Sequence, residues 1–110
     1  MLKMDLQYIR GILFVRLSGV LNRKSTYKIN NYLVPVLLKH KIRYLVYNLY
    51  ELDSIDESGV DALLNTKCAI RANKGKICLC EVSDSLKGQI KRLRIKYVQD
   101  ERCVFELIKI

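Results

Sequence analysis

The 110-residue chain has no tryptophan, one proline, one histidine and no long apolar run. Its longest apolar stretch, residues 32–38, contains Pro35 and is far shorter than the roughly 20 residues that a membrane-spanning helix needs. Residues 1–10 include Asp5 and Arg10 and lack the apolar core of a secretory signal. We therefore expect a cytoplasmic protein without a membrane span, folded as a single domain over residues 1–110.

The chain also lacks the residue combinations of common enzyme sites. No aspartate or asparagine signal accompanies His40, the only histidine, and no glycine-rich phosphate-binding loop is present. The four cysteines are expected to be reduced, and the spacing of Cys78 and Cys80 in an apolar run predicts two buried thiols on one face of a strand. A metal site would need two more ligands nearby. The sequence predicts no enzymatic activity, no cofactor and no metal site.

Charge is plentiful but unevenly distributed. Twenty Lys and Arg against eleven Asp and Glu give a net charge of +9, and the basic residues form no uninterrupted block of five or more. Five of the eleven acidic residues gather in one stretch that holds no Lys or Arg, and they are Glu51, Asp53, Asp56, Glu57 and Asp61. This pattern predicts a negative patch on a positive protein. Such a patch is not expected on a phosphate-binding face, so nucleic-acid binding is not the favoured interpretation.

The first part of the chain predicts a hairpin followed by a helix. Residues 6–9 and 12–17 are mainly apolar and flank the turn signal Arg10-Gly11. A helical pattern of apolar residues follows, with Ser25 and Thr26 as candidate N-caps. Pro35 inside this helix predicts a kink or a local distortion, because proline lacks the amide donor and clashes with the preceding turn.

The remaining sequence alternates strands with helices. We expect a buried strand at residues 44–49, a helix at about 59–72, a strand at 77–82, a helix that begins at Ser83 or Asp84, and an edge strand at 103–108. The predicted order is β-β-α-β-α-β-α-β. Helical crossovers return the chain to a parallel neighbour, so the pattern predicts an α/β fold with a mixed sheet.

The segment 52–64, which joins a predicted buried strand to a helix, is the most informative part of the sequence. Asp56 is placed to cap the helix, Glu57 adds negative charge at the positive end of the helix dipole, and Gly59 allows a tight turn or a close approach. Capping chemistry alone explains acidic residues at such a position. A functional loop is the alternative.

Four stretches of the chain resemble the STAS domain family of anti-sigma factor antagonists. Residues 45–49 through 56–60 resemble the family's strand and its Asp-Ser-Ser/Thr-Gly-Leu loop, while residues 17–22, 73–80 and 82–87 resemble its Leu-Thr-Gly-Glu-Leu-Asp segment, its strand entry and its third-helix start. The resemblance implies a mixed β-sheet of about five strands covered by three or four helices. It also implies a regulatory module that binds a kinase-type anti-sigma factor, a GHKL serine kinase, as a monomer or weak dimer.

In that family the kinase phosphorylates the first hydroxyl residue of the loop. This position falls on Glu57 here and the second hydroxyl position on Ser58, and Val20 and Asn22 stand where the family usually has acidic residues. Two interpretations follow: Ser58 has become the phosphoacceptor, or the loop is locked and the protein is a constitutive binder or a scaffold of a sensory assembly. The resemblance assigns partner binding to Asn22, Arg23, Asp56, Glu57, Ser58, Gly59, Val60 and Asp61.

A different class of function keeps the fold but uses the basic C-terminal part. Its candidate residues, which would bind RNA or anionic lipid headgroups, are Lys87, Lys91, Arg92, Arg94 and Lys96. A solvated helix face explains the same charges, and we favour that simpler explanation.

Overall fold

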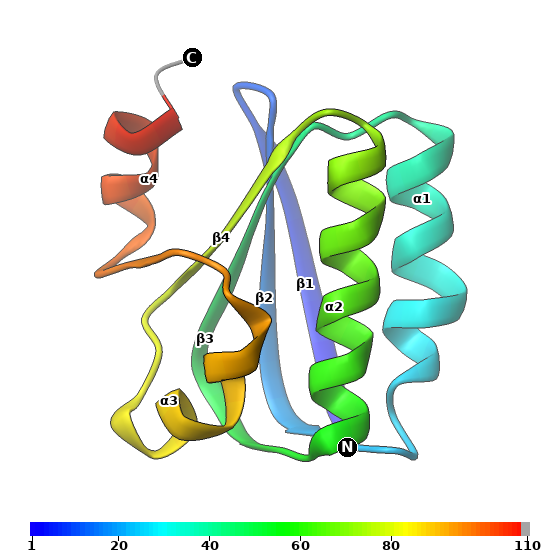
Figure 1. Ribbon diagram of the computed structural model, residues 1–110, viewed down its shortest axis with the longest axis vertical. Helices are drawn as coiled ribbons and strands as arrows, with labels where there is room; N and C mark the ends of the chain where they lie inside the picture. Colours follow the sequence, from blue (N-terminus) through cyan, green and yellow to red (C-terminus); the bar gives the residue numbers. More distant parts are fainter. Residues whose placement is uncertain (109–110) are drawn as a thin grey trace.

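The computed structural model describes residues 1–108 and contains one five-stranded mixed sheet (Figure 1). Its strands are β1 (Leu2–Ile9), β2 (Ile12–Leu21), β3 (Tyr44–Ile55), β4 (Lys76–Cys80) and β5 (Tyr97–Val98), which neighbour one another in that order. β1 and β2 are antiparallel, whereas the other neighbouring pairs are parallel. The predicted α/β class and mixed sheet are therefore confirmed.

Helical segments connect and cover these strands. They are η1 (Lys28–Leu33), α1 (Val34–Lys39), α2 (Glu57–Ala72), α3 (Asp84–Ile90), η2 (Lys91–Leu93) and α4 (Glu101–Ile108). Figure 1 shows α1 and α2 side by side on one side of the sheet, at the right of the view, and α4 on the other side, at the left beyond β4. No helix within residues 1–108 has the length and apolar character required to span a membrane.

The central strands β2, β3 and β4 are buried on both faces over part of their length, and alternate residues there enter different cores, whereas β1 is largely exposed. Val15 and Tyr47 belong to the larger core beneath α1, α2 and α3, whereas Phe14 and Val46 belong to a smaller core that includes Val104 of α4. This alternation follows from the two-residue period of strands. The face with α1 and α2 is called the helical face below, and the face with α4 the outer face.

The prediction that Cys78 and Cys80 are buried on the same face of a strand is confirmed. Cys78 and Cys80 of β4 are 3% and 0% exposed and face the same core as Val104. Burial raises the pKa of the Cys78 thiol to about 11 and that of Cys80 to about 12, so both thiols stay protonated at neutral pH.

The hairpin and the distortion at Pro35 are also confirmed. Arg10 and Gly11 have φ values of 51° and 82°, which a tight β-turn between antiparallel strands requires. Residues Lys28–Leu33 form a π-helix, and Pro35 lies in the first turn of α1, where its missing amide costs no hydrogen bond. Ser25 does not cap this helix as predicted, because its hydroxyl donates to the carbonyl of Val20 instead.

The predicted edge strand at residues 103–108 is wrong, since α4 occupies Glu101–Ile108 and the fifth strand lies earlier, at Tyr97–Val98. Asp100 accepts a hydrogen bond from the amide of Cys103 at 3.1 Å and so starts a helix. Val104 of that helix is buried in the outer-face core. A short, mostly apolar run such as residues 103–108, which Glu106 interrupts, is compatible with either a strand or a helix. The cap from Asp100 and the burial of Val104 favour the helix.

Candidate functional site

The site is built where β3 ends and α2 begins, around the carboxylate of Asp56. Asp56 is the N-cap of α2, and its Oδ1 accepts from the amide of Gly59 at 2.8 Å. Its own amide donates to the carbonyl of Leu21 at 3.1 Å, which fixes the end of β3 beside the end of β2. The capping role predicted from the sequence is confirmed. The helix begins at Glu57, two residues before the predicted start.

The second oxygen of Asp56 ties this helix start to the loop after β2. Its Oδ2 accepts from the amide of Arg23 at 3.2 Å. A second hydrogen bond lies within the loop itself, where Asn22 Oδ1 accepts from the amide of Lys24 at 2.9 Å. Between the loop and the helix lies a hollow of about 410 Å³, lined by Asn22, Arg23, Lys24, Asp56 and Ser58. Residues separated by more than thirty positions in the sequence thus form one surface.

The residues predicted to bind a partner divide into surface and core. Glu57 is exposed at the first position of α2, and Ser58 is half-buried at the second position and lines the hollow. Val60 is 2% exposed and packs in the helical-face core, so its side chain does not belong to the surface. Gly59 is also buried, and a Cβ there would lie 2.6 Å from the carbonyl oxygen of Leu21. The close approach expected of this glycine is confirmed.

The surface carries charges of both signs, so the prediction of a simple negative patch needs correction. Asp61 pairs with Arg92 of η2 at 2.9 Å, and a second contact of 3.4 Å joins Arg92 Nη2 to the carbonyl of Glu57. Lys24 lines the hollow together with Asp56 and Ser58. Sequence reasoning missed Lys24 and the pairing of Arg92, because no local pattern links residues from separate elements.

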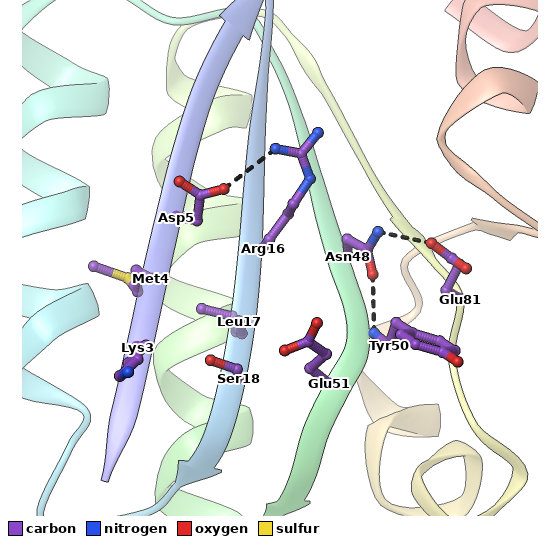
Figure 2. Close-up of a pocket in the computed structure, with 10 residues that line it drawn as sticks. All are labelled: Lys3, Met4, Asp5, Arg16, Leu17, Ser18, Asn48, Tyr50, Glu51 and Glu81. Carbon is purple, nitrogen blue, oxygen red and sulfur yellow. Dashed lines mark hydrogen bonds and ion pairs between the residues drawn. The ribbon is translucent and has the colours of Figure 1, made fainter.

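A second hollow, of about 360 Å³, lies on the outer face of the sheet (Figure 2). In its wall, Asn48 Nδ2 donates to Glu81 Oε2 and Glu101 Oε2, both at 2.8 Å, and Asn48 Oδ1 accepts from the amide of Tyr50. Arg16 hydrogen-bonds Glu101 and holds the pKa of that carboxyl below its usual range. These groups satisfy one another and fasten α4 to the sheet. Glu51 of the predicted acidic patch lines this hollow and not the one at Asp56.

Among the residues that the structure describes, no three side chains of the histidine, cysteine, aspartate or glutamate type are grouped to hold a metal ion. The arrangement around Asp56 presents a polar hollow and one half-buried serine hydroxyl. The Ser58 hydroxyl lies at a helix N-terminus, where the dipole stabilises added negative charge.

Comparison with known proteins places this geometry in context. The family model described as the STAS domain matches residues 3–100. An anti-sigma F factor antagonist from Paenibacillus polymyxa is 26% identical over 82 residues, which cover 74% of this chain and 70% of that protein.

Two solved structures show the same fold. The anti-sigma factor antagonist SpoIIAA in its unphosphorylated form has a TM-score of 0.81 and 18% identity, with 98% of this chain and 100% of that chain covered. RsbS from Moorella thermoacetica with a serine-to-glutamate substitution also has a TM-score of 0.81, with 11% identity and coverage of 97% and 95%. The five-stranded sheet and its helices are thus arranged as in those proteins.

Proposed function

This chain belongs to the STAS domain family, and we propose that it acts as an anti-sigma factor antagonist that binds a kinase-type anti-sigma factor in a partner switch. The similarity to the Paenibacillus polymyxa antagonist supports this role. The observation that carries the proposal is the surface at the start of α2, where Ser58 lines a hollow against the loop that contains Arg23.

The proposed docking surface combines the start of α2 with the loop after β2. Glu57, Asp61 and Arg23 are exposed, and the two segments are held together by Asp56 through the amides of Gly59 and Arg23. Because these hydrogen bonds already hold the loop after β2, binding of a partner costs this chain little additional conformational entropy. Gly59 and Val60 contribute indirectly, because they set how closely α2 approaches the ends of β2 and β3.

We assign the phosphoacceptor role to Ser58. The bound kinase transfers the γ-phosphoryl group of ATP to the Ser58 hydroxyl oxygen, so that one P–O bond forms, the bond to ADP breaks and the hydroxyl proton passes to a base of the kinase. The product carries about 1.5 to 2 negative charges at the second position of α2. The helix dipole favours this charge, and Arg23 and Lys24 stand across the hollow from it.

The same modification disturbs the surface that the partner binds. The phosphate lies beside the Asp56 carboxylate, which holds the amides of both Gly59 and Arg23. The phosphate adds negative charge beside Asp56 and Glu57 on the surface that the partner covers, so burying it beneath the partner costs desolvation and repulsion from these carboxylates. The modified protein therefore binds the kinase less tightly, which is the release step of a partner switch.

A second candidate is a constitutive binder or scaffold in which Glu57 fixes the state of the loop. Glu57 is exposed at the first position of α2 and supplies a permanent negative charge next to Ser58. This charge is smaller than that of a phosphate and is present without any kinase. The two candidates differ in whether a change of charge at Ser58 alters partner binding.

Pull-down from a lysate of the source cells tests the proposal, with wild type beside Ser58→Ala, Ser58→Asp and Ser85→Asp. Ser85 occupies the second position of α3, so Ser85→Asp adds the same charge to an equivalent place in a different helix. We expect wild type, Ser58→Ala and Ser85→Asp to recover a GHKL-type kinase and Ser58→Asp to lose it.

Recovery of the kinase by all four proteins would favour the constitutive binder. Recovery of no kinase by wild type would overturn the antagonist proposal. A circular dichroism spectrum of each variant identifies a loss of binding that arises from unfolding.

A further inference from the structure

We propose that the segment formed by η2 and its C-terminal extension, residues 91–96, is a basic docking ridge for an acidic segment of the partner protein. This inference rests on the proposed function, because the occupant is a segment of the same protein that covers the start of α2. It goes beyond the proposed function in two ways: the partner segment is negatively charged, and the docking surface extends outside the start of α2.

The backbone of the ridge sends its basic side chains outward. Leu93 and Ile95 are 0% and 7% exposed and anchor the segment in the helical-face core. The residues between and around them are all exposed, and they are Lys91, Arg92, Arg94 and Lys96. Basic side chains therefore project from a segment whose apolar residues hold it against the protein.

Two contacts from α2 hold this ridge in position. Lys67 donates from Nζ to the carbonyl of Leu93 at 2.9 Å, and Asp61 binds the guanidinium of Arg92 at 2.9 Å. Arg94 adopts the left-handed conformation, with φ 51° and ψ 40°, which ends η2. A non-glycine residue rarely adopts this conformation, and here the contacts on either side of it stabilise the turn.

The ridge keeps an excess of positive charge after its own ion pairs are made. Arg92 is neutralised by Asp61, whereas in the described part of the chain no ion pair involves Lys91, Arg94 or Lys96. A hollow of about 570 Å³ lies beside these side chains, lined by Gly88, Gln89, Lys91, Arg92 and Arg94. A Cβ added at Gly88 would meet no atom within 4 Å, so the hollow is open there.

Arg92 makes the ridge continuous with the proposed docking surface. Its Nη2 contacts both the Asp61 carboxylate and the carbonyl of Glu57, the first residue of α2. A protein that covers Glu57 and Ser58 therefore reaches the ridge without leaving the surface. Charge complementarity across this rim requires carboxylates on the partner, and it raises the association rate more than the lifetime of the complex.

Fluorescein-labelled decaglutamate is the probe, with binding followed by anisotropy at low and high salt. The test variant is Lys91→Glu/Arg94→Glu, and the matched control is Lys39→Glu/Lys41→Glu, which makes the same change of net charge at the exposed end of α1. We expect the test variant to bind at least about tenfold more weakly than wild type at low salt, because it reverses charges at the binding surface. The control should weaken binding less than the test variant, and by no more than about twofold at about 0.1 M salt, where the Debye length is roughly 10 Å and charges at the end of α1 are largely screened from the ridge.

Equal weakening in both double variants would overturn the ridge, because net charge alone would then explain binding. Absence of decaglutamate binding by wild type at low salt would overturn it as well. Single-stranded RNA and vesicles of phosphatidylglycerol are tested in parallel. Stronger binding to either one, lost in Lys91→Glu/Arg94→Glu alone, would assign the ridge to nucleic acid or lipid and contradict a protein occupant. None of these assays requires the kinase, so their failure is separable from failure of the partner switch.

Discussion

Arg16 of β2 and Glu101 of α4, which are 85 positions apart, form a two-point ion pair on the outer face of the sheet. Arg16 Nε lies 2.9 Å from Glu101 Oε2, and Nη2 lies 2.8 Å from Oε1. Asn48 of the central strand donates to the same carboxylate at 2.8 Å. This carboxylate therefore joins the last helix to two strands, in addition to the apolar contacts of Phe14 with Phe105.

Glu101→Gln should lower the free energy of unfolding by about 1 kcal/mol at pH 7, since it removes a partly exposed ion pair and keeps the side-chain shape. Hydrogen bonding by Arg16 lowers the pKa of Glu101 in the folded state. The stability supplied by the ionised carboxylate is thus present above the usual glutamate range and is lost as the pH falls through the lowered folded-state pKa. Urea unfolding of wild type and variant at several pH values measures the difference.

The control for this prediction is Asp84→Asn, which removes a pair with Lys87 in which the Asp84 side chain is 97% exposed. Its effect on stability should be close to zero. A difference between wild type and Glu101→Gln that grows as the pH is lowered would contradict the role assigned to the pair.

Two glycines in helices should respond to alanine in opposite directions. Gly59→Ala places a Cβ 2.6 Å from the Leu21 carbonyl oxygen and is expected to destabilise the fold by about 2 kcal/mol, because the backbone must shift. Gly88→Ala meets no atom within 4 Å and should stabilise α3 by about 0.5 to 1 kcal/mol through helix propensity. Thermal unfolding of both variants is the measurement, and a stable Gly59→Ala would show that α2 is not pressed against β2.

The buried hydroxyls of Tyr47 and Thr66 lie 2.8 Å apart, and Thr66 Oγ1 also donates to the carbonyl of Ala62 at 3.3 Å. Tyr47→Phe removes one hydrogen bond and leaves Thr66 with a partner, so we expect a cost of about 1 kcal/mol. Thr66→Val leaves the Tyr47 hydroxyl buried without a partner, and the expected cost is about 2 to 3 kcal/mol. Urea unfolding ranks the two, and the reverse order would refute this hydrogen-bond arrangement.

Replacement of Asp56 should disturb the loop after β2 as well as the start of α2. Asp56→Ala loses the cap on Gly59 at a cost of about 1 kcal/mol and also frees the amide of Arg23. Asp56→Asn keeps one acceptor oxygen and should retain most of the stability. Amide hydrogen exchange at Arg23 and Lys24 measures the loop, and unchanged protection in Asp56→Ala would mean that Asp56 does not hold it.

The features that could be predicted from the sequence are those with local causes. The turn at Gly11, the distortion before Pro35 and the cap at Asp56 each follow from the chemistry of one residue and its neighbours. The helix α4 could not be predicted from periodicity, since its form depends on the cap from Asp100 and on the burial of Val104 against the sheet.

The contacts between residues of the candidate site could not be predicted from the sequence either. Asp56 could be recognised as a cap, but its second bond goes to an amide 33 residues away. Asp61 could be recognised as part of an acidic stretch, but its neutralisation by Arg92 depends on how η2 packs beside α2. Contacts of this kind depend on how distant elements pack against each other, so no residue spacing in the sequence indicates them.

The most direct test of the partner switch is phosphorylation of the purified chain by the kinase that it captures. The chain is incubated with that kinase and ATP, and fragmentation mass spectrometry locates any phosphoryl group, with Ser58→Ala as the control. The partner-switch account predicts one phosphoryl group on Ser58 of the wild type, none on Ser58→Ala, and release of the kinase as the modification proceeds. A kinase that stays bound while Ser58 remains unmodified, or a phosphoryl group on a different residue, would contradict it.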